Sequence, residues 1–125
     1  MKEKQIQRQV AEFLDVANIL YTHVPNEMKS LSTLKSNVGD NAYFATIEEL
    51  RQQGAKKGVP DVLIFESPPE FPEKKGLALE LKTKDGKTTD DQEKWLRDLT
   101  KAGWLCAKSF GLEDAFNKLE AAGYK

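Results

Sequence analysis

Two short apolar segments near the middle of the chain, residues 61–65 and 77–83, have the composition that is typical of buried strands. Gly58 and Pro60 precede the first segment and mark where its strand begins. Because side chains alternate along a strand, the three leucines of the second segment share one face, and Glu80 and Lys82 are neighbours on the other. The pattern therefore predicts charged side chains on strands whose other neighbours are apolar.

The rest of the chain predicts helices and further strands. Apolar residues three and four apart predict helices at 4–20, 43–53, 89–101 and 112–123, and short apolar runs predict strands at 19–24 and 104–108. Residues 29–41, rich in Ser, Lys and Asn, predict a mobile loop, and the proline-rich residues 66–76 predict a hairpin excursion. Helices and strands mixed in this order indicate an α/β fold.

The charged residues on the central strands form the main candidate site. Charge is costly to bury unless a cation or a reaction uses it. If the two central strands pair antiparallel, Asp61 can arrive opposite the Glu80 end of its partner, so that it converges with Glu80 and Lys82, as expected of a metal-dependent site that cleaves phosphodiesters. The alternative is a half-exposed sheet face with a Glu–Lys ion pair. The triplet carboxylate-any-lysine decides nothing alone, because it begins at four positions, Glu27, Glu73, Glu80 and Asp85.

Two further polar residues are predicted to face inward on helices. At about 100° per residue, Glu3 projects onto the centre of the apolar stripe of the first helix, whereas Glu12 projects onto the opposite side. The alternative for Glu3 is a first-turn acid favoured by the helix dipole. Thr89-x-x-Gln92 fits a capping box, and Gln92 also lies on the inward face where that helix begins. Capping alone is the alternative explanation for Gln92.

Composition limits the classes of protein that the chain can represent. A length of 125 residues predicts one domain, residues 1–125, with a single core. The formal net charge of −1 does not by itself indicate a nucleic-acid binder, so any contact with DNA requires local basic patches. The candidate patches are Lys56 and Lys57, Lys74 and Lys75, and Lys82, Lys84 and Lys87. The alternative for most of these lysines is a solvated position in a turn.

The remaining reactive residues indicate no second site. Cys106 is the single cysteine, so an intramolecular disulfide is excluded, and its apolar neighbours predict a buried strand thiol in a reducing compartment. No Cys/His cluster suits zinc, and the lone His23 is interpreted as structural. The polar N-terminus and the lack of a membrane-length apolar run predict a soluble, cytoplasmic protein with no membrane partner.

The order of elements, with Pro-Asp and Glu-Leu-Lys on the central strands, resembles the PD-(D/E)XK nuclease superfamily, in which helices flank a central mixed β-sheet. More closely, residues 58–61 (Gly-Val-Pro-Asp), residues 80–83 (Glu-Leu-Lys-Thr) and Gln92 resemble the virus-type replication-repair nuclease (VRR-NUC) family. Residues 3–7 and 23–27 also resemble the start of that family. The resemblance runs over nearly the whole chain and implies a stand-alone domain of phage or bacterial type.

The resemblance also implies a role for each matching residue. The matching positions are the metal ligands Asp61 and Glu80, the metal-binding carbonyl of Leu81, the catalytic lysine Lys82, the active-site glutamine Gln92 and the helix-one glutamate Glu3. The implied cofactor is Mg²⁺ or Mn²⁺, and the implied activity is endonucleolytic hydrolysis of DNA in a repair setting.

For the substrate, the resemblance implies branched DNA, since small stand-alone members are associated with Holliday-junction resolution. A near-neutral domain of this size has little surface for wrapping duplex DNA, so a homodimer that presents two sites is expected. Two alternatives remain open. One is a nicking or loosely selective nuclease, and the other is a catalytically silent module that binds DNA or a partner on the same fold.

Overall fold

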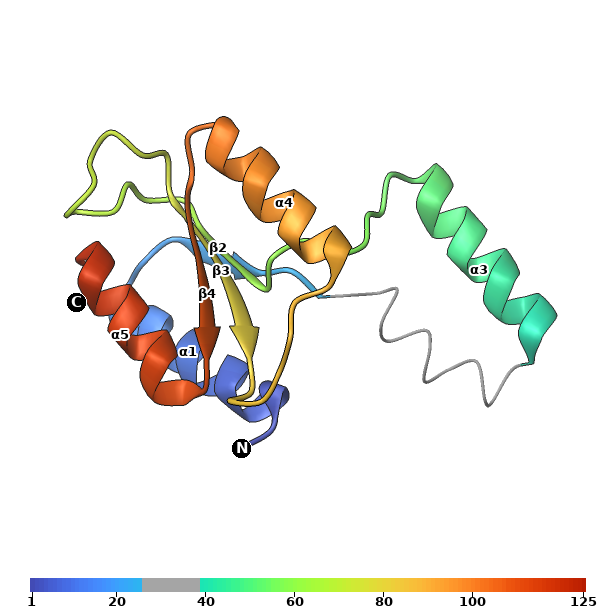
Figure 1. Cartoon of the computed structure of the whole chain (residues 1–125), viewed down its shortest axis with the longest axis horizontal. Coiled ribbons are helices and arrows are strands. Elements are labelled where there is room, and N and C mark those ends of the chain that lie inside the picture. Colours follow the sequence, from blue (N-terminus) through green and yellow to red (C-terminus); the bar gives the residue numbers. More distant parts are fainter. Residues whose placement is uncertain (26–38) are drawn as a thin grey trace.

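The computed structural model describes residues 1–25 and 39–125 and places helices on both faces of a mixed sheet (Figure 1). Its elements are α1 (Glu3–Val16), β1 (Tyr21–His23), α3 (Asp40–Gln52), β2 (Val62–Ile64), β3 (Leu77–Lys82), α4 (Asp90–Lys101), β4 (Leu105–Phe110) and α5 (Leu112–Ala122). The predicted α/β class and the mixed sheet flanked by helices are confirmed. The predicted loop at 29–41 lies mostly outside the described residues, and its last two residues belong to α3.

The sheet of the described residues has the strand order β1-β2-β3-β4. The first two pairings are antiparallel, and β3 pairs with β4 in parallel. In the β2–β3 register Val62 lies opposite Leu79, so the preceding residue, Asp61, arrives opposite Glu80. The parallel β4 covers the other edge of β3, which makes β3 an interior strand.

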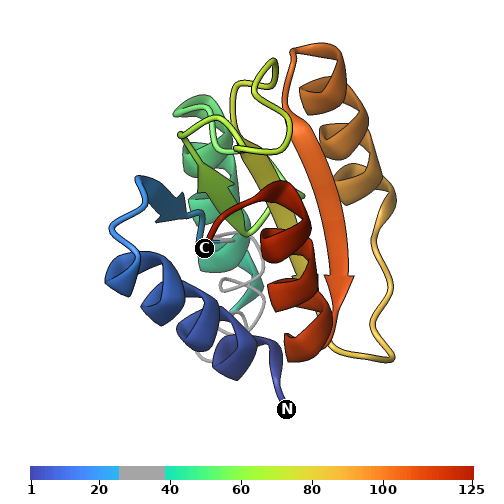
Figure 2. The same cartoon turned by 90° about the vertical axis from the view of Figure 1, so that its left-hand side faces the viewer.

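Both faces of β3 are buried because helices cover both sides of the sheet (Figure 2). On one face α1 and α5 pack over the leucines of β3, and the shared core contains Ile6, Val10, Leu14, Val62, Ile64, Leu77, Leu79, Leu81, Ala115 and Leu119. On the other face α4 lies over Glu80, which is only 1% exposed. All six residues of β3 are buried. The half-exposed sheet face is therefore wrong, and the charged residues of β3 lie in the interior.

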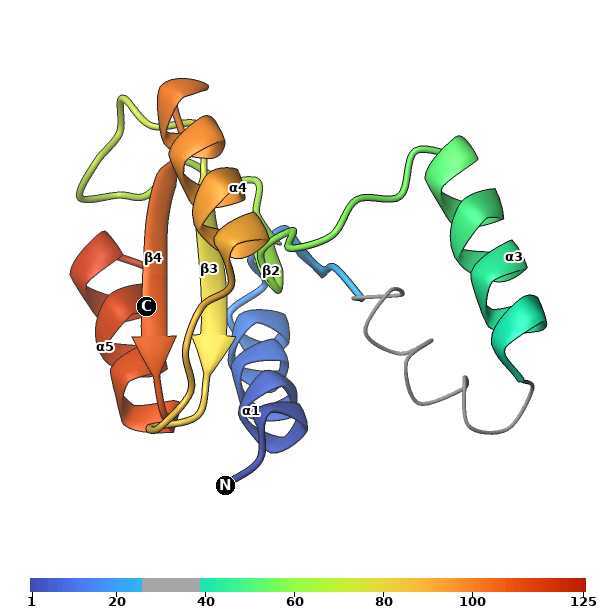
Figure 3. The same ribbon diagram turned by 45° about the vertical axis from the view of Figure 1, so that its right-hand side comes forward.

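Two segments lie away from the Asp61 end of the sheet. Helix α3 stands apart from the sheet and its covering helices (Figures 1 and 3). The proline-rich excursion, residues 66–76, leaves β2 at its far end and packs back on α5, where the Glu70 N–H donates to the Ala122 carbonyl at 3.1 Å. Six residues of β3 span roughly 17 Å, so the excursion is remote from Glu80 and Lys82. Within the described ranges, no helix is long and apolar enough to cross a membrane.

Candidate active site

Asp61 directly precedes β2, where the regular pairing with β3 stops. Its Oδ2 accepts a hydrogen bond from the Leu81 N–H at 2.8 Å. This bond takes the place of the next backbone hydrogen bond between β2 and β3, which a carbonyl oxygen would otherwise accept. Its own carbonyl accepts from the Val24 N–H at 2.8 Å and from His23 Nδ1 at 2.9 Å. A carbonyl oxygen only accepts, so this nitrogen of His23 carries the proton. The backbone and the side chain of Asp61 are both held, and His23 has a structural role.

Glu80 and Lys82 share the interior face of β3 that α4 covers. Lys82 is 5% exposed, and its Nζ lies 3.7 Å from Glu80 Oε1. The same oxygen accepts a hydrogen bond from Gln92 Nε2 at 2.9 Å. The second carboxylate oxygen of Glu80, Oε2, is buried and, when the group is ionised, has no hydrogen-bond donor in the described part of the chain, whereas the protonated carboxyl group can share its proton with Asp61. A buried carboxylate oxygen without a partner is costly, and such an atom is typical of a site that receives a ligand.

Gln92 connects the start of α4 with the carboxylate. Its Oε1 accepts from the Thr89 N–H at 2.8 Å, and its own N–H donates to Thr89 Oγ1 at 3.2 Å, so the predicted capping box is confirmed. Capping leaves the amide Nε2 available, and this group donates to Glu80. Capping alone is therefore an incomplete explanation, because the side chain is bifunctional and performs both tasks at once.

Gly58 allows the segment that leads to Asp61 to lie directly on the start of α4. Its φ is +82°, and a Cβ at this position would meet the Asp91 carbonyl carbon at 2.6 Å and the Gln92 nitrogen at 2.7 Å. Both are backbone atoms and cannot move without shifting the helix. Gly58 is therefore required by a close backbone approach as well as by its conformation.

We expect Gly58→Ala to lower the melting temperature and the cleavage rate together, because the clash displaces Gln92 from Glu80. Gly54→Ala is the matched control, since Gly54 has a φ of +97° and a Cβ added there would meet no atom within 4 Å. The strained backbone is common to both variants and the clash is not. Differential scanning fluorimetry and a cleavage assay compare them, and equal losses for the two variants would contradict the packing role.

The two carboxyl groups of the cluster resist ionisation. Burial, followed by the nearby charge of Asp61, raises the pKa of Glu80 to about 8. The Lys82 ammonium group opposes this change but does not cancel it. Burial also raises the pKa of Asp61, and the hydrogen bond from the Leu81 N–H partly offsets that effect. Perturbed carboxyl groups of this kind are typical of functional sites.

Glu3 lies close enough to this cluster for its charge to act on both carboxyl groups. It is the first residue of α1, it is half-buried, and its charge raises the pKa of both Asp61 and Glu80. Glu12 is exposed, as the helical projection predicts. Across residues 1–25 and 39–125, no three His, Cys, Asp or Glu side chains are grouped to hold a metal ion. The structure thus brings together Asp61, Glu80, Lys82 and Gln92, and the charge of Glu3 acts on the two carboxyl groups.

Gln7 is a residue to which sequence reasoning assigned no role. It follows Glu3 by four residues and so shares its face of α1. Both polar atoms of its amide are buried and have no hydrogen-bond partner among the described residues. The i, i+4 spacing from Glu3 was the available signal, but only the tertiary structure establishes that the amide is enclosed.

The donor atoms of this cluster fit a divalent cation of the Mg²⁺ type. Asp61, just before β2, and Glu80, on β3, carry hard oxygen atoms of the kind that Mg²⁺ prefers, and Oε2 of Glu80 is a buried oxygen that no donor of the described residues contacts. A cation there would offset the cost of burying the two carboxyl groups, which raises both pKa values, and the repulsion from Asp61 that raises the pKa of Glu80 further. Leu81 lies between Glu80 and Lys82, and its N–H is already used by Asp61.

The comparisons with known proteins identify the family of the chain. A family model described as the VRR-NUC domain matches residues 1–107, a range that contains every predicted site residue. A solved structure described as a VRR_NUC domain protein is similar with a TM-score of 0.69 and 15% identity, over 98% of this chain and 88% of that chain. At that identity the likeness supports the fold alone, and no curated protein matches the sequence. Because the family model covers most of the chain, the chain belongs to the VRR-NUC family and carries a nuclease-type domain.

Proposed function

We propose that this chain is a divalent-metal-dependent endonuclease that hydrolyses phosphodiester bonds in branched DNA, as a homodimer. The observation that carries the proposal is the enclosed Glu80 carboxylate, with Asp61 beside it and both Lys82 and Gln92 directed at one of its oxygens. A buried ion pair or a buried pair of carboxyl groups adds little net stability, because removing the charges from water costs about as much free energy as their interactions provide. A catalytic role explains why such a group occupies the interior strand of the sheet.

Each residue has a task that its position allows. Asp61 and Glu80, with the carbonyl of Leu81, would hold Mg²⁺ or Mn²⁺, which supplies Lewis acidity toward phosphoryl oxygens and a more acidic bound water. The Nζ of Lys82 offsets negative charge on the phosphate and orients the attacking water. Gln92 keeps the Glu80 carboxylate in one rotamer through its Nε2 hydrogen bond. Glu3 acts through its charge on this cluster.

The preference for branched DNA rests on symmetry and on the small size of the domain. A four-way junction requires two cuts, and each chain has one cluster of this kind in its described residues. A twofold dimer presents two such sites and doubles the basic side chains that contact DNA. Light scattering on the purified protein is expected to give the mass of two chains, and a monomer that resolves junctions with two coordinated cuts would contradict the dimer.

The proposed function is tested with a four-way junction, a flap and a linear duplex of matched sequence, each in Mg²⁺, Mn²⁺ and EDTA. We expect metal-dependent cleavage that is fastest on the junction. Equal rates on all three substrates would favour a nicking or loosely selective nuclease and contradict the junction preference. No cleavage in either metal would contradict the enzymatic proposal and favour a module that only binds DNA.

We expect the free energy of unfolding in EDTA to fall as the pH rises from about 5 to about 8. The pKa of Glu80 is raised from 4.5 to about 8, so the native state keeps a proton that the unfolded state releases in this range. The raised pKa of Asp61 acts in the same direction. At about 1.4 kcal/mol per pKa unit, the shift of Glu80 corresponds to a loss on the order of 5 kcal/mol, most of which occurs between pH 5 and pH 8 and which is complete above pH 8.

Urea unfolding at pH 5, 6, 7 and 8 measures this loss. Glu80→Gln is the control, since an amide does not titrate, and its stability is expected to change much less across the same pH values. A silent module predicts no stabilisation by Mg²⁺ at pH 8, whereas the proposed metal site predicts that Mg²⁺ restores part of the lost stability. A wild-type stability that rises between pH 5 and pH 8 would contradict the buried, protonated carboxyl group.

A further inference from the structure

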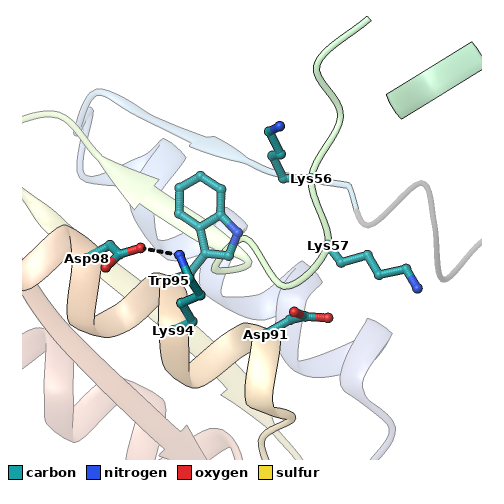
Figure 4. A pocket seen from close by; sticks show the side chains of 6 residues that line it. All are labelled: Lys56, Lys57, Asp91, Lys94, Trp95 and Asp98. Atoms are coloured by element: carbon teal, nitrogen blue, oxygen red, sulfur yellow. Dashed lines mark hydrogen bonds and ion pairs between the residues drawn. The ribbon is translucent and has the colours of Figure 1, made fainter. Parts of the chain in front are cut away.

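A hollow of about 460 Å³ lies between α4 and the segment that leads to β2 (Figure 4). Its lining residues are Lys56, Lys57, Asp91, Lys94, Trp95 and Asp98. Figure 4 shows the indole of Trp95 standing on α4 toward the segment that carries Lys56 and Lys57. The volume is within the roughly 300–1,000 Å³ range of pockets that take small ligands. None of the site residues assigned above lines this hollow.

The hollow is lined mainly by charged residues, and a more apolar hollow adjoins it. A second hollow, of about 340 Å³, shares Lys56 and Trp95 with the first. Its other lining residues are Val24, Pro25, Gly54, Ala55 and Val59. The indole thus stands where ammonium groups meet an apolar surface. A nucleotide has the matching composition, with an anionic phosphate at one end and a flat base at the other.

The charges on the rim favour a nucleotide over a free anion. Lys94 is already paired with Asp98 at 2.9 Å, so its charge is largely compensated. Lys56 and Lys57 are exposed, and neither forms an ion pair with any residue of 1–25 or 39–125. Asp91 also lines the hollow, so a free phosphate ion would be repelled by carboxylates as well as attracted by ammonium groups. A base stacked on Trp95 supplies binding that the charges alone do not.

Both walls of the hollow lead directly to the active site. Asp91 precedes Gln92 on α4, and Val59 precedes Asp61 by two residues. Trp95 lies three residues beyond Gln92, which is about 4.5 Å along the helix axis. Trp95 is therefore less than one turn of α4 from Gln92, which donates to Glu80, so a strand stacked on Trp95 is directed toward the cluster.

We propose that this hollow is a nucleotide subsite, in which the indole of Trp95 stacks on a base of the substrate strand and Lys56 and Lys57 bind its phosphates. The inference rests on the proposed function for the identity of the strand, and it specifies how that strand approaches the cluster. The subsite is expected to bind strands of any base sequence, because every base has a face that stacks on an aromatic ring.

The first test measures binding without cleavage. In a Trp104→Phe background, Trp95 is the remaining tryptophan, and its fluorescence is recorded as a ten-nucleotide single strand is added in EDTA. We expect quenching that saturates, and we expect Trp95→Ala to weaken binding of the strand about tenfold by anisotropy while Trp95→Phe restores most of it. No change in fluorescence while the strand binds would overturn the subsite.

The second test uses exposed lysines, whose loss does not disturb the core. The double variant Lys56→Ala, Lys57→Ala is expected to raise KM severalfold with little change in kcat, and to reduce the salt dependence of DNA binding. The double variant Lys74→Ala, Lys75→Ala removes the same charge at the remote excursion and serves as the control. Equal effects of the two double variants would overturn the subsite and indicate nonspecific electrostatics.

These results separate the subsite from the proposed function. If the wild-type protein cleaves DNA but Trp95→Ala has unchanged KM and unchanged binding, the subsite is wrong and the nuclease proposal stands. If the wild-type protein cleaves no DNA but the strand quenches Trp95 and the Lys56 and Lys57 variant weakens its binding, the subsite stands and the nuclease proposal is wrong.

Discussion

Glu80→Gln is expected to lower the rate of DNA cleavage at least about 1,000-fold while leaving the fold intact. The amide has the same shape as the carboxylate but loses the anionic oxygen that a divalent ion requires. Charge stabilisation by a bound metal contributes several kcal/mol to the transition state, and each 1.36 kcal/mol is tenfold in rate. Single-turnover cleavage of the four-way junction in Mg²⁺ measures the effect.

The same variant is expected to melt at a temperature equal to or above that of the wild type in EDTA at pH 8. At that pH the wild type carries a carboxyl group with a pKa of about 8 in the interior next to Asp61, and the neutral amide removes that repulsion. Addition of Mg²⁺ should raise the melting temperature of the wild type and not that of the variant. A loss of activity with retained stability distinguishes a functional carboxylate from a structural one.

Glu73→Gln is the matched control for this experiment. Glu73 begins the same carboxylate-any-lysine triplet as Glu80, but it is exposed and lies in the remote excursion. The exchange removes the same charge from the chain, so any general electrostatic effect on DNA binding is common to both variants. We expect wild-type cleavage by Glu73→Gln, and comparable losses for the two variants would contradict the assignment of Glu80.

Lys82→Met is expected to lower kcat by 10²- to 10⁴-fold, with a much smaller change in DNA affinity. Methionine keeps an unbranched, apolar stem of similar length in this buried position but removes the ammonium group 3.7 Å from Glu80. In the proposed mechanism the lost group offsets phosphate charge and orients the attacking water, and general acid–base contributions of this kind are typically about 10²- to 10⁴-fold. Cleavage at saturating DNA and binding in EDTA separate the two effects.

Lys75→Met provides the control for this variant, since it removes one ammonium group from the exposed lysine that completes the Glu73 triplet. Lys82→Met should also raise the pKa of Glu80 further, because the Lys82 charge holds that pKa down. The pH at which the rate is half-maximal is therefore expected to move upward in Lys82→Met and to stay constant in Lys75→Met. A loss of DNA affinity that matches the loss of rate would contradict the catalytic role.

The local elements of the fold were predictable because their signals are periodic and short-range. The alternation in residues 77–83 correctly made Glu80 and Lys82 neighbours on one face of a strand. The capping box of Thr89 and Gln92 was evident from its spacing and is confirmed. Antiparallel pairing of the two strands was predicted to bring Asp61 toward the Glu80 end of β3, and the structure supplies the register that places the two residues opposite each other.

Strand pattern could not decide whether the charged face of β3 is buried. An ion pair on a solvated sheet and a catalytic pair in the interior have the same local sequence, and the same triplet recurs at Glu73 in an exposed turn. Only the packing of α4 over β3 encloses Glu80 and leaves its Oε2 without a partner in the described residues. The cost of that burial is the physical reason for assigning a function to the face.

Local sequence was sufficient to specify the strand that carries the acidic and basic groups, the helix that begins after Thr89, and the membership of the chain in a nuclease family. The contacts between segments that are distant in the sequence became evident only from the three-dimensional packing. Gly58 meets the backbone of α4, and Trp95 faces two lysines that precede it by nearly forty residues. Contacts of this kind depend on how distant segments are placed in space, and no local periodicity encodes that placement.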